Sequence, residues 1–81
     1  MTRTLTARQR QVLRLVANGN TNTATGRQLG IHRNTVDRHL SEIFRILGAS
    51  DRAQAVAIAL AVGELGVHEI HIPDQQREKA A

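Results

Sequence analysis

The stretch IHRNTVDRHLSEIFRIL, residues 31–47, decides the fold expected for this 81-residue chain. Its apolar residues recur at i, i+4, i+7, i+8 and i+11, the spacing of one stripe along an α-helix: Val36, Leu40, Ile43, Phe44 and Leu47. Polar residues with a similar spacing occupy the opposite face: Asn34, Arg38, Ser41 and Arg45. The pattern predicts a helix with one stripe in a core and one hydrogen-bonding face outward, which can read base edges in a DNA major groove.

Capping and turn signals predict three further helices. Residues able to cap a helix N-terminus stand before each of four stretches: Thr6, Thr21, His32 and Asp51. Glycines that can end a helix follow the same stretches: Gly19, Gly30, Gly48 and Gly63. The predicted helices span residues 7–17, 22–29, 33–47 and 52–62. Because their connections are short, we expect an all-α domain over residues 1–65, with four helices in a helix-turn-helix arrangement.

Residues 66–81 form a C-terminal tail outside this domain. VHEIHI, residues 67–72, alternates enough for a short strand, and the polar residues after Pro73 predict a disordered end. The strand could pair with a second copy of the chain or lie over the helix at 52–62. The sequence leaves both alternatives open.

Composition and charge favour duplex DNA as the partner. The net charge is +4, and residues 1–65 carry nine arginines against four acidic residues. Arginine suits phosphate and guanine, whereas Phe44, the single aromatic residue, lies on the apolar stripe, so the stacking platforms of single-strand binders are missing. The absence of cysteine excludes disulfides and cysteine-rich zinc sites. We expect a cytoplasmic protein, since the sequence shows neither a secretory h-region nor a membrane-spanning run.

The helix at 52–62 is apolar almost all round, which indicates burial on two sides. Val56, Ala59 and Leu60 can face the domain core, whereas the other sides then carry Ala55, Ile58 and Val62. A second copy of the chain would cover the second side in a symmetric dimer. The predicted interface comprises Ala55, Ile58, Ala59 and Val62. The alternative is that an alanine-rich surface reflects helix propensity alone.

Residues 5–65, about three quarters of the chain, resemble the LuxR-type helix-turn-helix domain of bacterial regulators. The matching segments are LTARQRQVLRLVANG, LGIHRNTVDRHL and LGASDRAQAVAIALAVGEL. The resemblance implies a four-helix domain whose third helix enters the major groove and whose fourth helix mediates dimerisation. It also implies that Arg52, which matches a near-constant arginine of the family, ties the fourth helix to the domain or contacts phosphate.

The sequence departs from the family pattern at several positions. Gln9 stands where the family usually has Glu, and Ala24-Thr25-Gly26 stands where it has Glu-Ile-Ala. We expect Thr25 and Gly26 to loosen the second helix, since a mid-helix glycine costs about 0.5–1 kcal/mol. Ile46 replaces a common lysine, so one phosphate contact is expected to be missing. Asp37 falls where relatives often carry a basic or small residue, and it must accept from cytosine N4 or orient a neighbouring arginine to be favourable near DNA.

Candidate base contacts lie on the third helix. Arg38 can approach guanine with both ends of its guanidinium, and Asn34 can approach adenine N6 and N7. The competing interpretation is that Arg38 pairs with Glu42 and that Asn34 only favours a helix start. Other candidate base contacts are Arg33, Asp37 and Ser41. Candidate phosphate contacts are Thr21, Asn22, Thr35, Arg45 and Arg52.

The sequence therefore predicts a stand-alone, dimeric, sequence-specific DNA-binding regulator, and Met1 favours a complete chain. We expect no enzyme activity, no cofactor and no metal, since His68 and His71 have no third ligand nearby in sequence. The alternative is a protein-interaction module with weakened DNA contacts, which modulates RNA polymerase or another regulator. Asp37 and Ile46 are the residues that favour this alternative.

Overall fold

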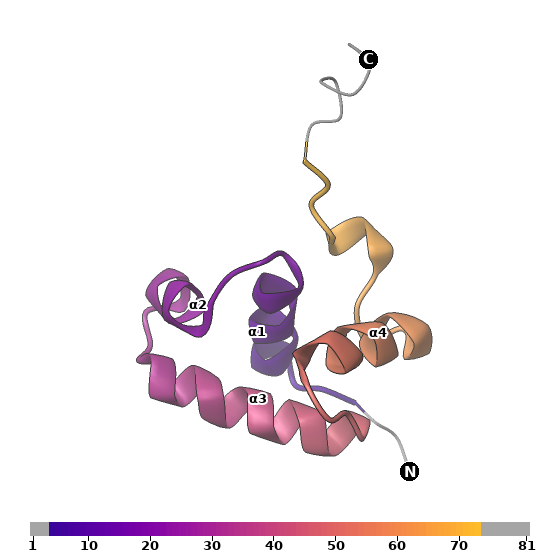
Figure 1. Cartoon of the computed structure of the whole chain (residues 1–81), viewed down its shortest axis with the longest axis horizontal. Coiled ribbons are helices and arrows are strands. Elements are labelled where there is room, and N and C mark those ends of the chain that lie inside the picture. Colours follow the sequence, from indigo (N-terminus) through magenta and orange to yellow (C-terminus); the bar gives the residue numbers. More distant parts are fainter. Residues whose placement is uncertain (1–3, 74–81) are drawn as a thin grey trace.

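All four predicted helices are present in the computed structural model, which describes residues 4–73, and their predicted bounds are confirmed. The helices are α1 (Ala7–Ala17), α2 (Asn22–Leu29), α3 (Arg33–Leu47) and α4 (Arg52–Val62). Helix α3 packs against the three other helices. Figure 1 shows α3 crossing one side of the domain, with α2 near its N-terminal end and α4 near its C-terminal end. This arrangement leaves the far side of α3 uncovered by other helices.

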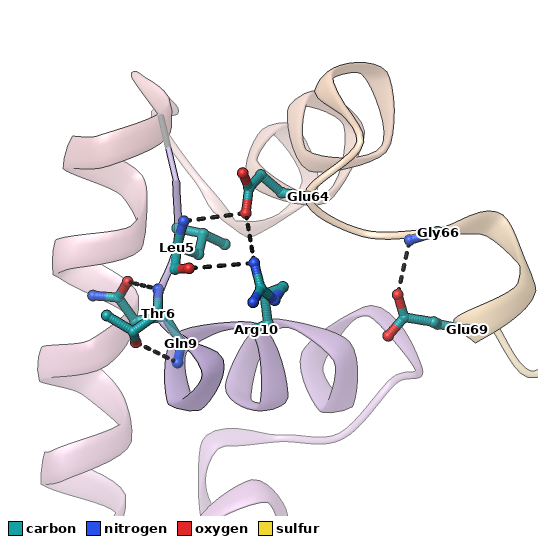
Figure 2. A network of polar contacts seen from close by, with 7 residues as sticks. All are labelled: Leu5, Thr6, Gln9, Arg10, Glu64, Gly66 and Glu69. Carbon is teal, nitrogen blue, oxygen red and sulfur yellow. Dashed lines mark hydrogen bonds and ion pairs between the residues drawn. The ribbon is translucent and has the colours of Figure 1, made fainter. Parts of the chain in front are cut away.

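Side-chain caps define where the helices begin. At α1 the hydroxyl of Thr6 accepts a hydrogen bond from the backbone N–H of Gln9 at 3.0 Å, and Gln9 Oε1 accepts from the N–H of Thr6 at 2.8 Å (Figure 2). At α4 Asp51 accepts from the N–H of Gln54 at 2.8 Å, while Gln54 Oε1 accepts from Ser50 rather than from Asp51. These bonds satisfy amides that a helix N-terminus leaves without partners.

The core lies between α1, α3 and α4. The predicted stripe of α3 is buried as expected, with Leu40 the most exposed of its four fully packed residues at 4%. Phe44, the fifth, is half-buried against the same cluster. The buried apolar residues are Leu5, Val12, Leu13, Val16, Val36, Leu40, Ile43, Leu47, Ala55, Ala59 and Leu65. Ile46 also packs against this cluster, which explains an apolar side chain at its position.

The orientation of α4 corrects half of the predicted dimer interface. Ala55 and Ala59 are 0% exposed in the single chain and belong to the core, so neither has surface to offer a partner. Their small side chains let the α4 backbone approach the rest of the domain closely. Ile58 is half-buried and Val62 is 52% exposed. Of the four predicted interface residues, only these two remain available to a second copy.

At Gly26 the backbone of α2 packs closely against the backbone of the turn that follows it. Gly26 is buried, and a Cβ at this position would lie 2.5 Å from the carbonyl oxygen of Ile31. The absence of a side chain therefore serves backbone packing against the turn into α3, a role that the sequence pattern did not indicate. Next to it Thr25 is 0% exposed, and its hydroxyl has no hydrogen-bond partner within residues 4–73.

The prediction of a strand at 67–72 was wrong. Val67–Glu69 forms a short 3-10 helix, and the Glu69 carboxylate accepts from the N–H of Gly66 at 2.9 Å (Figure 2). Asn18, which ends α1, then holds the segment: its Nδ2 donates to the carbonyl of Glu69 at 3.0 Å and its Oδ1 accepts from the N–H of His71 at 2.5 Å. The clamp from Asn18 takes the carbonyl of Glu69 and the N–H of His71, two backbone groups that strand pairing would use. The predicted disordered end, residues 74–81, lies outside the described residues.

A polar network joins the two ends of the helical domain (Figure 2). The Glu64 carboxylate, which follows α4, accepts from the N–H of Leu5 at 3.1 Å and from the Arg10 guanidinium at 3.2 Å. Arg10 also donates to the carbonyl of Leu5 at 3.3 Å. The Glu64 side chain is only 15% exposed, so this pair is better shielded than an ordinary surface ion pair.

Candidate nucleic-acid interface

The polar face of α3, which we define as Asn34, Arg38, Ser41 and Arg45, is exposed to solvent along its whole length. The candidate residues Arg33 and Asp37 are exposed at its edges. His32 caps the helix as predicted, since its Nδ1 accepts from the N–H of Asn34 at 3.0 Å. No pocket opens on the surface of residues 4–73. The face is therefore an open, rod-like surface rather than a cleft.

Arg38 does not pair with Glu42, the partner that the competing interpretation assigned to it. Glu42 instead forms an ion pair with Arg45, three residues further along α3. Within the part of the chain that the structure describes, Arg38 makes neither a hydrogen bond nor an ion pair. Its guanidinium keeps all its donors available for an external acceptor.

The Glu42–Arg45 pair occupies the C-terminal part of the polar face. The hydrogen bond from Arg45 lowers the pKa of Glu42, and the same bond raises the pKa of Arg45. Both side chains lie in solvent, where such pairs contribute little to stability. Arg45 can therefore exchange the carboxylate for a phosphate at little cost.

Three candidate residues from different helices form one hydrogen-bonded chain. Asn22, the first residue of α2, donates through Nδ2 to the Oδ1 atom of Asp37 on α3. Arg52, the first residue of α4, donates to Asn22 Oδ1 at 2.6 Å. The sequence pattern predicted phosphate contacts for Asn22 and Arg52 and a base contact for Asp37, and it did not predict that the three are joined. Since they are 15 and 30 positions apart, no local pattern could have joined them.

The start of α2, where Asn22 is bonded to Asp37 of α3, supplies further polar groups. The Thr21 hydroxyl caps the helix by accepting from the N–H of Ala24 at 3.0 Å, and it retains its own proton as a donor. Thr35 is half-buried in the first turn of α3. Free amides and the positive end of the helix dipole at such a start favour an anion.

Within residues 4–73, no group of three His, Cys, Asp or Glu residues is placed to hold a metal ion. Over the same range, none of the helices is both long and apolar enough to cross a bilayer.

A short second helix, a tight turn and an exposed third helix define a helix-turn-helix protein of the four-helix type. Residues 3–59 match the family described as bacterial regulatory proteins, luxR family. The chain belongs to this LuxR family and carries its helix-turn-helix DNA-binding domain.

Curated relatives with clear similarity include proteins named as transcriptional regulators and one named as a spore germination protein. The chain is 47% identical over 58 residues to the probable transcriptional regulatory protein SgaR of Hyphomicrobium methylovorum, covering 72% of this chain and 28% of SgaR. It is 38% identical over 61 residues to the spore germination protein GerE of Bacillus subtilis, covering 75% of this chain and 82% of GerE. The chain thus spans little more than a quarter of the first relative and most of the second.

Solved structures show the same fold. The structure of GerE superposes with a TM-score of 0.74 at 33% identity, covering 82% of this chain and 97% of that one. A structure of VqmA from Vibrio cholerae, described as a dimer and as a LuxR-type receptor, has a TM-score of 0.73 at 32% identity and covers 78% of this chain and 28% of that one. The expected four-helix LuxR-type fold is confirmed.

Proposed function

We propose that this protein is a cytoplasmic regulator that binds specific duplex DNA sequences by inserting the polar face of α3 into the major groove. One observation carries the proposal: the apolar stripe of α3 is packed into the core, while Asn34 and Arg38 on the opposite face remain exposed. A helix held this way presents its side chains to base edges without disturbing the domain.

Arg38 is the first candidate for a base contact because no side chain of the described chain engages it. Its planar fork matches O6 and N7 of guanine, and Asn34 one turn earlier matches N6 and N7 of adenine. Arg33 and Ser41 flank these two on exposed positions. The backbone on either side would be held by Thr21, Asn22, Thr35, Arg45 and Arg52, from the starts of α2, α3 and α4 and the end of α3.

The proposed assembly is a symmetric dimer that pairs α4 with α4 through Ile58 and Val62. The exposure of an apolar side chain such as Val62 supports this assembly, and VqmA is described as a dimer. A two-fold axis through α4 would place the two α3 helices about one DNA turn apart, roughly 10 bp. Inserting five base pairs between half-sites would then place one helix on the wrong side of the duplex.

Fluorescence anisotropy on duplex DNA tests the proposal. We expect binding that weakens steeply with salt, by about one unit of log–log slope for each phosphate contact. On a selected site, Arg38→Ala should lower affinity by about 1–3 kcal/mol and relax the choice of base at one position. Binding that is absent at low salt would refute the proposal and favour the protein-interaction module. Equal affinity for sites with and without the five-base-pair insertion would refute the dimer.

A further inference from the structure

The chain of hydrogen bonds from Arg52 through Asn22 to Asp37 has a direction fixed by chemistry. Arg52 can only donate and the Asp37 carboxylate can only accept, so the amide between them must turn its oxygen toward Arg52 and its nitrogen toward Asp37. Asparagine is one of few side chains that can join an arginine to a carboxylate in this way. The amide therefore holds Asp37 in one orientation, and Arg52 holds the amide.

This bridge leaves part of the carboxylate available. Asn22 engages Asp37 Oδ1, whereas no bond within residues 4–73 engages Oδ2. Asp37 is exposed at the edge of the polar face of α3, beside Arg38. A bare carboxylate facing DNA would be repelled by phosphate. Here the amide dipole and the nearby Arg52 charge offset that repulsion, so the carboxylate can remain at the surface that meets the duplex.

A carboxylate accepts hydrogen bonds and donates none, which restricts the base it can face. Guanine presents two acceptors in the major groove and thymine presents one, and both repel it. Adenine presents its amino group beside the N7 acceptor, whereas the cytosine N4 amino group lies next to the non-polar C5 edge. Cytosine is therefore the base that a fixed carboxylate accommodates best.

We propose that Asp37 is a specificity-determining residue that requires cytosine at one position of each half-site, and that Asn22 is its positioning residue. The inference rests on the proposed DNA-binding function and adds to it the identity of one base. It also gives Asn22 and Arg52 a shared role, because together they hold Asp37 in place for reading, whether or not they contact phosphate themselves.

Selection from random duplexes, followed by anisotropy on the selected site, tests this assignment. For the wild type we expect about a tenfold loss of affinity when the assigned cytosine is replaced, as for a typical mismatch. Asp37→Asn and Asp37→Ala should lose this preference while keeping the other preferred positions. Asn22→Ala should weaken the preference for cytosine, and in an Asp37→Asn background it should cause no further change in base preference.

The matched control is Asp51→Asn, which removes the same charge next to Arg52. Asparagine is also a good N-cap, so the helix start is retained. This variant should bind DNA more tightly at low salt without a change in preferred sequence. Thermal melts of every variant by circular dichroism confirm that each one is folded.

The outcomes separate the inference from the proposed function. If the wild type binds no duplex, both the proposed function and this inference are refuted. If the wild type binds selectively and Asp37→Asn or Asp37→Ala selects the same sequence with equal strength, the inference is refuted and the function stands. If Asp37→Asn loses the cytosine and Asn22→Ala keeps it in full, the positioning role of Asn22 is refuted.

Discussion

Replacing Thr25 by valine should make the protein more stable. Thr25 is 0% exposed in α2, and its hydroxyl finds no partner within residues 4–73. A buried polar group left without a hydrogen bond costs about 1–3 kcal/mol. Valine has nearly the same shape, and the two residues have similar helix propensity, so the change removes the cost of the hydroxyl and little else. We expect the free energy of unfolding to rise by about 1–2 kcal/mol.

Urea unfolding followed by circular dichroism at fixed protein concentration measures this gain. The midpoint should rise with an unchanged slope, and the melting temperature should rise by about 4–8 °C for each kcal/mol in a domain of this size. Thr23→Val is the matched control, since Thr23 is exposed on the same helix and its replacement should stay within about 0.5 kcal/mol. If Thr25→Val is no more stable than the wild type while Thr23→Val is neutral, the hydroxyl is satisfied in solution and the reasoning is refuted.

Three further predictions concern packing, the tail and charge. Gly26→Ala should lower the free energy of unfolding by about 1–3 kcal/mol, because the added Cβ would clash with the carbonyl oxygen of Ile31. This cost outweighs the gain in helix propensity from glycine to alanine, which is about 0.5–1 kcal/mol. Urea unfolding measures the change. Asn18→Ala should speed hydrogen exchange of the His71 amide about 3- to 10-fold, the value of one hydrogen bond. An NMR titration should place the pKa of Glu42 below its ordinary value, and Arg45→Ala should restore it. The stabilisation from this pair is present above the ordinary pKa and is lost as the pH falls through the lowered one.

Contrary results are equally specific. If the free energy of unfolding rises in Gly26→Ala, the turn after α2 shifts to accommodate the added Cβ, and the gain in helix propensity is the larger effect. Unchanged exchange at His71 would mean that the clamp from Asn18 does not form in solution. A Glu42 titration that is the same with and without Arg45 would mean that the ion pair does not persist in water.

The sequence predicted the helix bounds because the signals that set them are local. A cap such as Thr6 and a closing glycine such as Gly48 act within a few residues, and the period of the α3 stripe shows directly which face is buried. Helix α4 has no such contrast, since apolar residues lie all round it. The sequence therefore did not show which face of α4 is buried: Ala55 was assigned to the interface and Ala59 to both the core and the interface, whereas both are fully buried in the single chain.

Contacts between distant residues were the other part that the sequence could not predict. The amide bridge at Asn22 and the clamp at Asn18 join segments 15 to 53 positions apart, and asparagine at a helix end is usually explained by capping alone. The exposure of the candidate base contacts could be predicted because it follows from the α3 period. The partners that orient them depend on how α2 and α4 lie in space.

The bond between Leu5 and Glu64 has a practical consequence for protein engineering. Since the backbone of one end of the four-helix unit lies 3.1 Å from a side chain at the other, a short linker can join the two ends, and new termini can be opened in a surface turn. The same proximity lets the unit be inserted whole into a host loop. In either design α3 would keep its outward face, because its apolar stripe would still pack into the core.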